Sequence, residues 1–288
     1  MNILYITNFK SSLNHSGFIN DYLNDLLYHG FTELNEVNIV ETIPIICLYN
    51  EYKNIIEPYH LWGKGFTSCF LLENDTKERD SIKEKIEQKY YDLIIYGSCK
   101  RCLDGYDVIS QIYEQSKIVL IDGSDDTLLH PLYEKHTLFK RELTINQKNV
   151  LPIHFAIPGC KITRETAKKT RMLSLIIPGE KYTFDVEQDY YKEYQSSNFA
   201  ITTKKAGWDC MRHYEILANK CIPIFKDLQN CPQNTLTNLP KELLIECESM
   251  IDNFDQDKYD SANNELFNFT KQHLTTKQLA NYVLEKII

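Results

Sequence analysis

The sequence predicts an α/β protein made of two Rossmann-like domains that face each other across a cleft. Two continuous apolar runs, Asp92–Gly97 (DLIIYG) and Lys117–Asp122 (KIVLID), each follow a helical pattern, and such runs are typical of parallel strands buried on both faces. Strand, loop, helix and strand alternate again in the stretch from Asn198 to Phe225. A length of 288 residues suits two domains of ordinary size. We expect the first domain at residues 1–157 and the second at residues 158–288.

Composition narrows the class of protein further. The formal net charge of −8 argues against a nucleic-acid partner, which normally requires a basic face. No apolar run approaches the roughly 18 residues of a transmembrane segment, and Met1 leads into a strand-like run rather than a signal peptide. The nine cysteines are scattered, and the one close pair, Cys99 and Cys102, lacks partners for a zinc site. We therefore expect a soluble, cytoplasmic protein with free thiols and no metal.

A strand, a polar loop and a helix open the first domain. Ile3–Thr7 is a short apolar run, and the helical pattern over Ile19–Leu27 is expected to end at Gly30, since glycine favours the position just after a helix. The loop between them follows the carboxyl end of the first strand, where doubly wound domains bind ligands. Asn8 and Lys10 are therefore cleft candidates, and an ordinary solvated loop is the alternative.

The chain between this helix and the buried strands is less regular. Val37–Val40 and Ile43–Tyr49 have strand character, and Pro44 marks an edge or a break because it lacks a backbone N–H. Asp75–Lys89 predicts a surface helix with a narrow apolar stripe. Tyr59–Phe70 carries aromatic residues and glycines without a clear period. This last segment either shapes a pocket or packs its aromatic rings in the core.

Polar residues follow both buried strands at the edge where a cleft would lie. Ser98 comes after the first strand and is a cleft candidate, and Asp122, Asp125 and Asp126 end the second in the turn DGSDD. These acids could act as a general base or bind a metal, or they could simply form a polar turn and helix cap. We take Asp122, Asp125, Asp126 and the nearby His130 as catalytic candidates, in that order.

Basic and titratable side chains gather just before the expected domain joint. His136, Lys140 and Arg141 follow His130 within about a dozen residues, and a joint between domains is a common place for a substrate. Lys140 and Arg141 are therefore further cleft candidates, and a solvated helix face is the alternative. Val150–Ile157 then predicts a strand, and the charged segment after it is the expected linker.

The second domain opens with the apolar run Met172–Ile177 and a helical pattern over Asp185–Ser196. Later helical patterns begin at Lys241 and cover Ser261–Leu274 and Thr276–Ile288. The last of these patterns has an apolar face, so we expect the helix to dock against the rest of the protein.

The loop and helix inside Asn198–Phe225 hold the strongest functional candidates. Asp209 is the expected N-cap of a helix over Cys210–Asn219, and Arg212 and Glu215 share a face near its N-terminus, where free amides and the helix dipole favour an anion. A guanidinium can stabilise departing phosphates, and a carboxylate can grip ribose hydroxyls. The alternative is a surface ion pair between Arg212 and Glu215. The full set of binding candidates is Lys204, Lys205, Trp208, Arg212, His213 and Glu215.

The residues from Arg212 to Phe225, RHYEILANKCIPIF, also resemble the donor-binding segment of GT-B fold glycosyltransferases, particularly the exostosin-like and CgeB-like groups. The resemblance implies that the second domain holds a nucleotide-sugar donor, that the first holds the acceptor, and that no metal is required. By position it places Glu215 at the donor ribose or sugar and Arg212 at the phosphates. Lys220 departs from the family's usual glycine after the helix, where Asn219 is the other residue that tolerates a left-handed conformation.

We therefore interpret the chain as a glycosyltransferase that moves a sugar from a nucleotide sugar to a hydroxyl acceptor, a glycan or glycoconjugate, without a cofactor. One alternative is a DNA-base-modifying glucosyltransferase of the same fold, which the acidic net charge argues against. The other is a non-catalytic nucleotide- or glycan-binding module. Lys220 in place of glycine is the one feature of the sequence that points to it.

Overall fold

Two parallel sheets form the framework of the protein. The computed structural model describes residues 1–7, 17–164, 167–180 and 184–288. Within them, every neighbouring pair of strands runs parallel. One sheet has the spatial order β2-β1-β3-β4-β5-β6 and the other the order β7-β8-β9. The strands are β1 (Asn2–Ile6), β2 (Asn38–Glu41), β3 (Leu93–Tyr96), β4 (Ile118–Asp122), β5 (Thr137–Lys140), β6 (Val150–Pro152), β7 (Arg171–Leu173), β8 (Ser197–Thr202) and β9 (Ile222–Phe225).

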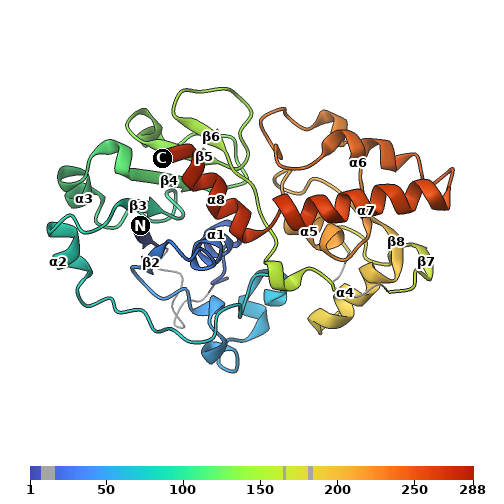
Figure 1. The fold of residues 1–288 in the computed structure, drawn as a ribbon, viewed down its shortest axis with the longest axis horizontal. Coiled ribbons are helices and arrows are strands. Elements are labelled where there is room, and N and C mark those ends of the chain that lie inside the picture. Colours follow the sequence, from blue (N-terminus) through green and yellow to red (C-terminus); the bar gives the residue numbers. More distant parts are fainter. Residues whose placement is uncertain (8–16, 165–166, 181–183) are drawn as a thin grey trace.

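Helices surround both sheets. They are α1 (Tyr22–Thr32), α2 (Ile82–Glu87), α3 (Tyr106–Ile112), α4 (Glu187–Gln195), α5 (Met211–Ala218), α6 (Lys241–Glu248), α7 (Gln256–His273) and α8 (Thr276–Ile287). Figure 1 shows α1, α2, α3 and α8 with the larger sheet in one half of the molecule, and α4 to α7 with the smaller sheet in the other. No helix in the described ranges combines the length and the apolar character needed to cross a membrane.

The apolar runs of the sequence form the strands that they predict. The run DLIIYG contains β3 and the run KIVLID contains β4, and the two pair parallel with Ile94 opposite Ile118 and Ile95 opposite Val119. All four side chains are fully buried, because helices cover both faces of a parallel sheet of this kind. The α/β class with parallel sheets is therefore confirmed.

Several predicted elements differ from the structure. Of the predicted strand Val150–Ile157, only Val150–Pro152 forms a strand, β6. Within Ile43–Tyr49 the chain forms a short 3-10 turn over Ile46–Leu48 instead of a strand, so the proline in this run does mark a break. The predicted helix over Asp75–Lys89 shrinks to α2. Its first part is held outside a helix by Arg79, whose Nη2 donates to the buried carboxylate of Glu41 at 2.6 Å.

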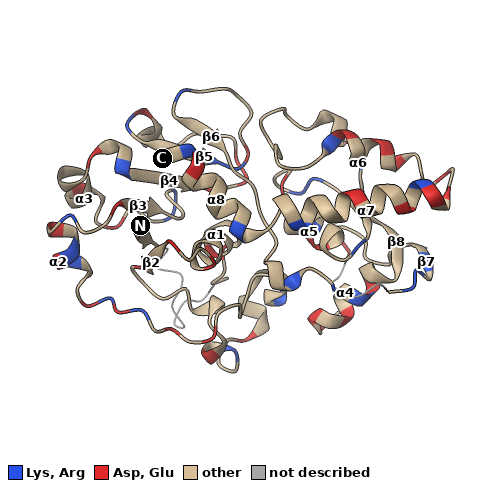
Figure 2. Cartoon of the chain, in the orientation of Figure 1, with Lys and Arg blue, Asp and Glu red and all other residues tan. Residues whose placement is uncertain are grey.

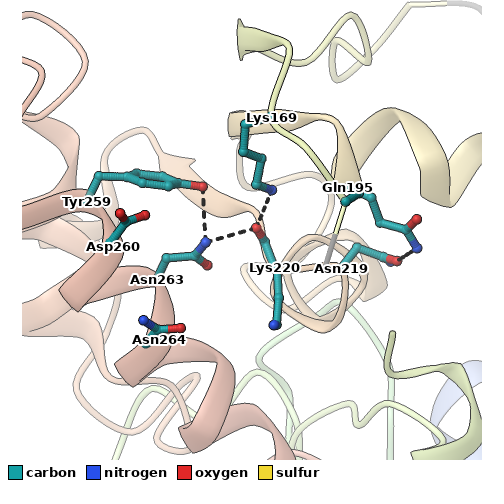
Figure 3. A pocket seen from close by; sticks show the side chains of 9 residues that line it. Lys169, Gln195, Asn219, Lys220, Tyr259, Asp260, Asn263 and Asn264 are labelled. Carbon is teal, nitrogen blue, oxygen red and sulfur yellow. Dashed lines mark hydrogen bonds between the residues drawn. The ribbon is translucent and has the colours of Figure 1, made fainter. Parts of the chain in front are cut away.

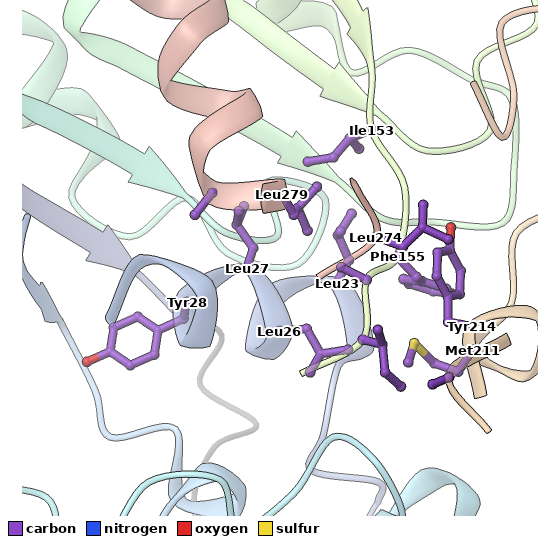
Figure 4. Close-up of a cluster of buried hydrophobic side chains, with 14 of the residues drawn as sticks. Leu23, Leu26, Leu27, Tyr28, Ile153, Phe155, Met211, Tyr214, Leu274 and Leu279 are labelled. Atoms are coloured by element: carbon purple, nitrogen blue, oxygen red, sulfur yellow. The ribbon is translucent and has the colours of Figure 1, made fainter. Parts of the chain in front are cut away.

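The last helix of the chain packs against the first, as Figures 1 and 4 show for α8 and α1. Gly30 does not end the first helix as predicted but lies inside α1, which continues to Thr32. A Cβ on Gly30 would lie 2.0 Å from the carbonyl oxygen of Thr276 at the start of α8, so glycine is required for this close approach. The predicted docking of the last helix is confirmed, and the domain division after residue 157 stays a prediction.

The buried core is continuous between the two halves. Figure 4 shows Leu23 and Leu27 of α1 beside Leu279 of α8, while Phe155, Met211 and Tyr214 lie at the other end of the same cluster. Met211 and Tyr214 belong to α5 of the second half. Apolar packing therefore fixes the start of α5 against the first half.

A complete Schellman motif ends α5 at Lys220. The Cys221 amide donates to the Ile216 carbonyl and the Lys220 amide to the Leu217 carbonyl, each at 3.2 Å. Lys220 itself takes the left-handed conformation with φ of 53°, whereas Asn219 has φ of −104°. The lysine thus adopts the backbone conformation that glycine normally supplies at this position.

Replacing Lys220 with glycine is expected to raise the free energy of unfolding by about 1 kcal/mol, because a side chain in the left-handed region costs roughly that much. Lys220→Ala is the matched control, since it keeps the strained backbone and loses the contact of the lysine ammonium with the Phe267 ring at 4.8 Å. Urea unfolding should give the highest free energy of unfolding for the glycine variant, a lower one for the wild type and the lowest for the alanine variant. Equal stability of the glycine and alanine variants would contradict the assignment of strain.

Candidate functional site

A pocket of about 560 Å³ lies where the two halves meet. It opens at the amino ends of α1 and α5 and beyond the carboxyl ends of β4 and β8, which is where α/β proteins bind ligands. The first half contributes Asn20, Asp21, Tyr22, Trp62, Gly63, Arg101, Gly123, Asp125, Arg141 and Phe155. The second half contributes Tyr190, Lys205, Ala206, Gly207, Asp209, Cys210, Met211, Arg212 and Glu215.

Arg212 lines this pocket, and one of its guanidinium nitrogens has no hydrogen-bond partner in the described structure. It occupies the first turn of α5, and its Nη1 is buried with no hydrogen-bond partner among the residues that the structure describes. A buried guanidinium nitrogen without a partner is costly. Lys205 lines the same pocket, and the amino end of the helix adds partial positive charge. Together these groups place positive charge at this end of the pocket.

Glu215 lies one turn further along α5 and is held by two hydroxyls. Thr67 Oγ1 donates to its Oε1 and Tyr190 OH to its Oε2, both at 2.6 Å. No ion pair forms between Glu215 and Arg212, so the alternative of a surface pair is wrong for these two described residues. Burial raises the pKa of Glu215, and the bonds from Thr67 and Tyr190 oppose that rise.

Asp209 does not cap α5 as predicted. The N-cap is Cys210, which makes no capping bond with its side chain. The Asp209 carboxylate instead accepts from the Phe155 amide at 2.6 Å and from the Tyr214 hydroxyl at 3.0 Å. Because Phe155 belongs to the first half, this carboxylate joins the two halves beneath the pocket.

Arg141 makes a second connection between the halves. It directly follows β5, so the alternative of a solvated helix face for this segment is wrong. Its Nε donates to the Gly123 carbonyl at 2.9 Å, its Nη1 to the Asp209 carbonyl at 2.5 Å and to Glu142 Oε1 at 3.0 Å, and its Nη2 to Asp125. The guanidinium is almost fully buried.

Glu142 completes this connection from the neighbouring position. Its carboxylate accepts from the amides of Trp208 and Asp209, at 2.9 and 3.1 Å. The loop before α5 comes so close that a Cβ on Gly207 would lie 2.5 Å from Glu142 Oε1. Glycine at this position therefore lets the loop reach the first half.

Asp125 is the one predicted catalytic residue that lines the pocket. Asp122 is buried between the ammonium groups of Lys100 and Lys140, at 3.2 and 3.1 Å. Asp126 pairs with Lys100 at 2.5 Å. Burial acts to raise its pKa, but the hydrogen bonds from Lys100 and the Leu128 amide, with the charges of Lys140 and Lys100, together lower the pKa to about 2. Asp122 and Asp126 thus form ion pairs with lysines and do not line the pocket.

The remaining predicted residues lie outside the pocket lining. His130 accepts from the Leu132 amide at 3.3 Å, and Ser98 donates to Asp21 at 3.5 Å. The Lys204 ammonium lies over the Trp208 ring, 5.2 Å from its centroid. Lys140 is fully buried in its ion pairs. Asn8 and Lys10 fall outside the described residues.

His213 is a core residue rather than a ligand contact. Its Nδ1 accepts from the Thr202 hydroxyl at 2.9 Å, and its Nε2 donates to the Trp208 carbonyl at 2.9 Å. The ring stacks on Phe225 with centroids 4.3 Å apart. Burial lowers the pKa of His213 from 6.5 to about 4, so the imidazole is neutral at pH 7.

Folding stability should fall as the pH drops from 6.5 toward 4. In that range His213 binds a proton in the unfolded chain but not in the folded state. The loss of folding free energy reaches roughly 3 kcal/mol before it levels off. His213→Gln, which cannot titrate, should remove this part of the slope in urea unfolding at a series of pH values. If the free energy of unfolding depends on pH in the same way in the wild type and the variant, His213 does not cause the loss of stability at low pH.

Two residues at the site, Asp21 in the pocket lining and Thr67 beside Glu215, are not predicted from the sequence. Asp21 is the N-cap of α1 and pairs with Arg101 at 2.5 Å, so a capping signal could have suggested it. Thr67 contacts Glu215 from a loop with φ of 70°. Because Thr67 and Glu215 are 148 positions apart, no local pattern links them.

A second hollow of about 310 Å³ lies on α7 and the end of α5. Figure 3 shows hydrogen bonds among several of its lining residues, while Asp260 and Asn264 are drawn without one. Gln195 donates to Asn219 at 2.8 Å, and Asn263 donates to the Lys220 carbonyl at 3.2 Å and to the Tyr259 hydroxyl at 3.1 Å. None of the buried side-chain atoms that lack a partner in the described structure belongs to a residue of this hollow, in contrast to Arg212 Nη1.

Comparison with solved structures finds a likeness along nearly the whole chain. No protein-family model matches the chain, and no curated protein does. Among solved structures, an alpha-glucosyltransferase in complex with UDP-glucose and DNA containing an abasic site aligns over 99% of this chain and 98% of that chain, with a TM-score of 0.50 and 11% sequence identity. The exostosin-like and CgeB-like subtype stays a prediction. The likeness supports a shared overall fold along nearly the whole of both chains.

Proposed function

We propose that the protein is a glycosyltransferase that moves a sugar from a nucleotide sugar to a hydroxyl acceptor. The observation that carries the proposal is Arg212 at the amino end of α5: it lines a pocket formed from both halves, and its buried Nη1 has no hydrogen-bond partner among the described residues. In this proposal the halves act as two Rossmann-like domains across a cleft. The second holds the donor and the first the acceptor.

Arg212 and Glu215 of α5, and Lys205 in the loop before it, each have a role in the transfer. The bond between the anomeric carbon and the phosphate oxygen breaks, and the nucleotide leaves with the electron pair and growing negative charge. Arg212, Lys205 and the helix dipole stabilise that charge. Glu215, positioned by Thr67 and Tyr190, accepts hydrogen bonds from the ribose hydroxyls.

The acceptor hydroxyl must lose a proton as its oxygen takes the anomeric carbon. Asp125 and Asp21 are the carboxylates that line the pocket from the described part of the first half. Asp125 is our candidate base, because the sequence predicts it as a catalytic residue and it lines the pocket. Asp125 is paired with Arg141, so the acceptor must compete for that ion pair.

UDP-glucose is the first donor to test, because the structurally similar alpha-glucosyltransferase was solved with it. We propose that transfer needs no metal and no cofactor beyond the donor, and that the protein works in the cytoplasm. These proposals rest on the resemblance and the composition of the sequence.

A DNA-base acceptor is the second candidate, because the similar structure also contains DNA. The net charge of −8 disfavours it. Figure 2 shows acidic and basic positions interspersed along α4 and α7 rather than a basic stripe on either helix. A gel shift with duplex DNA that weakens with salt would favour this candidate.

Thermal stabilisation by nucleotide sugars tests the proposed function. A ligand that binds only the folded state at a hundred times its Kd adds about 2.7 kcal/mol of stability, so at least one of the UDP, GDP, CMP or dTDP sugars should raise the Tm. Failure of all of them contradicts the proposal. Donor hydrolysis by the wild type but not by Glu215→Ala would in turn exclude a non-catalytic binding module.

A further inference from the structure

Two exposed aromatic rings are stacked at the first-half edge of the pocket. Phe18 and Trp62 lie nearly parallel, with ring centroids 3.6 Å apart and an angle of 17° between the rings. Trp62 is 49% exposed and Phe18 40% exposed, and Trp62 lines the pocket. Large aromatic side chains left in water beside a pocket commonly mark a binding surface.

Hydrogen bonds join the two backbone segments that carry these rings. The Trp62 amide donates to Asn20 Oδ1 at 2.7 Å, and Asn20 Nδ2 donates back to the Trp62 carbonyl at 3.4 Å. The Ile19 amide donates to the His60 carbonyl at 3.0 Å. Asn20 is almost fully buried. These three bonds join the two segments that carry Phe18 and Trp62, so the stack is organised before a ligand arrives.

The charges around the stack favour a neutral ligand over a polyanion. Arg101 pairs with Asp21, and Arg141 pairs with Asp125, so the guanidinium groups of this wall are already neutralised. Phosphates of a nucleic acid require free cations. Hydroxyl groups, in contrast, bond well to paired carboxylates and guanidiniums, which offer both acceptors and donors.

The faces of aromatic rings carry negative charge density and attract the weakly positive C–H groups of a sugar ring. A pyranose has C–H groups on its faces and hydroxyls around its rim, which matches an indole face beside a polar wall. We propose that the Phe18–Trp62 stack binds a sugar ring of a neutral saccharide acceptor. This inference rests on the proposed function and assigns its acceptor class.

Calorimetric titration with maltotriose, cellotriose and triacetylchitotriose tests the inference. At least one trisaccharide should bind the wild type, and Trp62→Ala should weaken its affinity about tenfold, while Trp62→Phe retains most of it. Tyr59→Ala is the matched control, since Tyr59 is in the same segment, 71% exposed and outside the pocket lining. It should bind as the wild type does. Melting curves without ligand verify that each variant is folded.

Three outcomes would overturn the inference: no trisaccharide binds the wild type, Trp62→Ala binds as well as Tyr59→Ala, or a DNA duplex binds at this stack instead. UDP-glucose is titrated in parallel. Saccharide binding at Trp62 without any nucleotide-sugar binding would contradict the proposed function but not the saccharide site at the Phe18–Trp62 stack. Nucleotide-sugar binding without saccharide binding would contradict the saccharide site alone.

Discussion

Replacing Arg212 with methionine should lower kcat/KM for UDP-glucose about 100- to 1,000-fold, the usual cost of removing one donor that faces developing charge in a transition state. The same change should not destabilise the protein. The Nη1 of Arg212 is buried without a partner in the described structure, so methionine removes an uncompensated polar group and keeps most of the apolar stem. Activity and stability should therefore change independently.

Steady-state kinetics and urea unfolding of the same preparations measure these two effects. Lys192→Met is the control, because Lys192 is an exposed cation in an ion pair with Asp189 on α4. It should change neither quantity by a meaningful amount. A loss of activity in the Arg212 variant that tracks a loss of stability would mean that Arg212 is structural.

Replacing Arg141 with methionine should cost about 3–5 kcal/mol of folding stability, the usual penalty for removing one partner of a buried ion pair. Its guanidinium bonds to Gly123, Glu142, Asp125 and the Asp209 carbonyl. Without it the Glu142 carboxylate is left buried without its cation. The free energy of unfolding from urea titration checks the size of the loss.

A second variant separates the buried charge from the lost contacts of Arg141. Adding Glu142→Gln to Arg141→Met removes the uncompensated carboxylate and should recover part of the stability, because Gln keeps an oxygen acceptor for the amides of Trp208 and Asp209. If the single variant loses less than about 1 kcal/mol, like an exposed ion pair, then Arg141 does not tie the halves together.

The sheets and α5 could be predicted because their signals are local. Apolar runs such as DLIIYG and KIVLID are buried wherever they pair, so composition alone identifies β3 and β4. Arg212 and Glu215 share a helical face through their spacing, and the structure brings both to the pocket. These features follow from a few neighbouring residues.

Residues whose partners lie far away in the chain could not be predicted correctly. Asp209 has the pattern of an N-cap, but the Phe155 amide, 54 positions earlier, takes its carboxylate. Gly30 has the pattern of a helix end, but the start of α8 packs against it. Asp122 has the position of a catalytic acid, but Lys100 and Lys140 neutralise it. In each case a tertiary contact outweighs the local preference.

The central claim is that a nucleotide sugar occupies the pocket with its phosphates at Arg212. A crystal structure of the complex with UDP-glucose tests it most directly. We expect a diphosphate oxygen within about 2.7–3.2 Å of Arg212 Nη1 and the ribose hydroxyls at Glu215. A nucleotide bound elsewhere, with Arg212 Nη1 still unpartnered, would contradict the account.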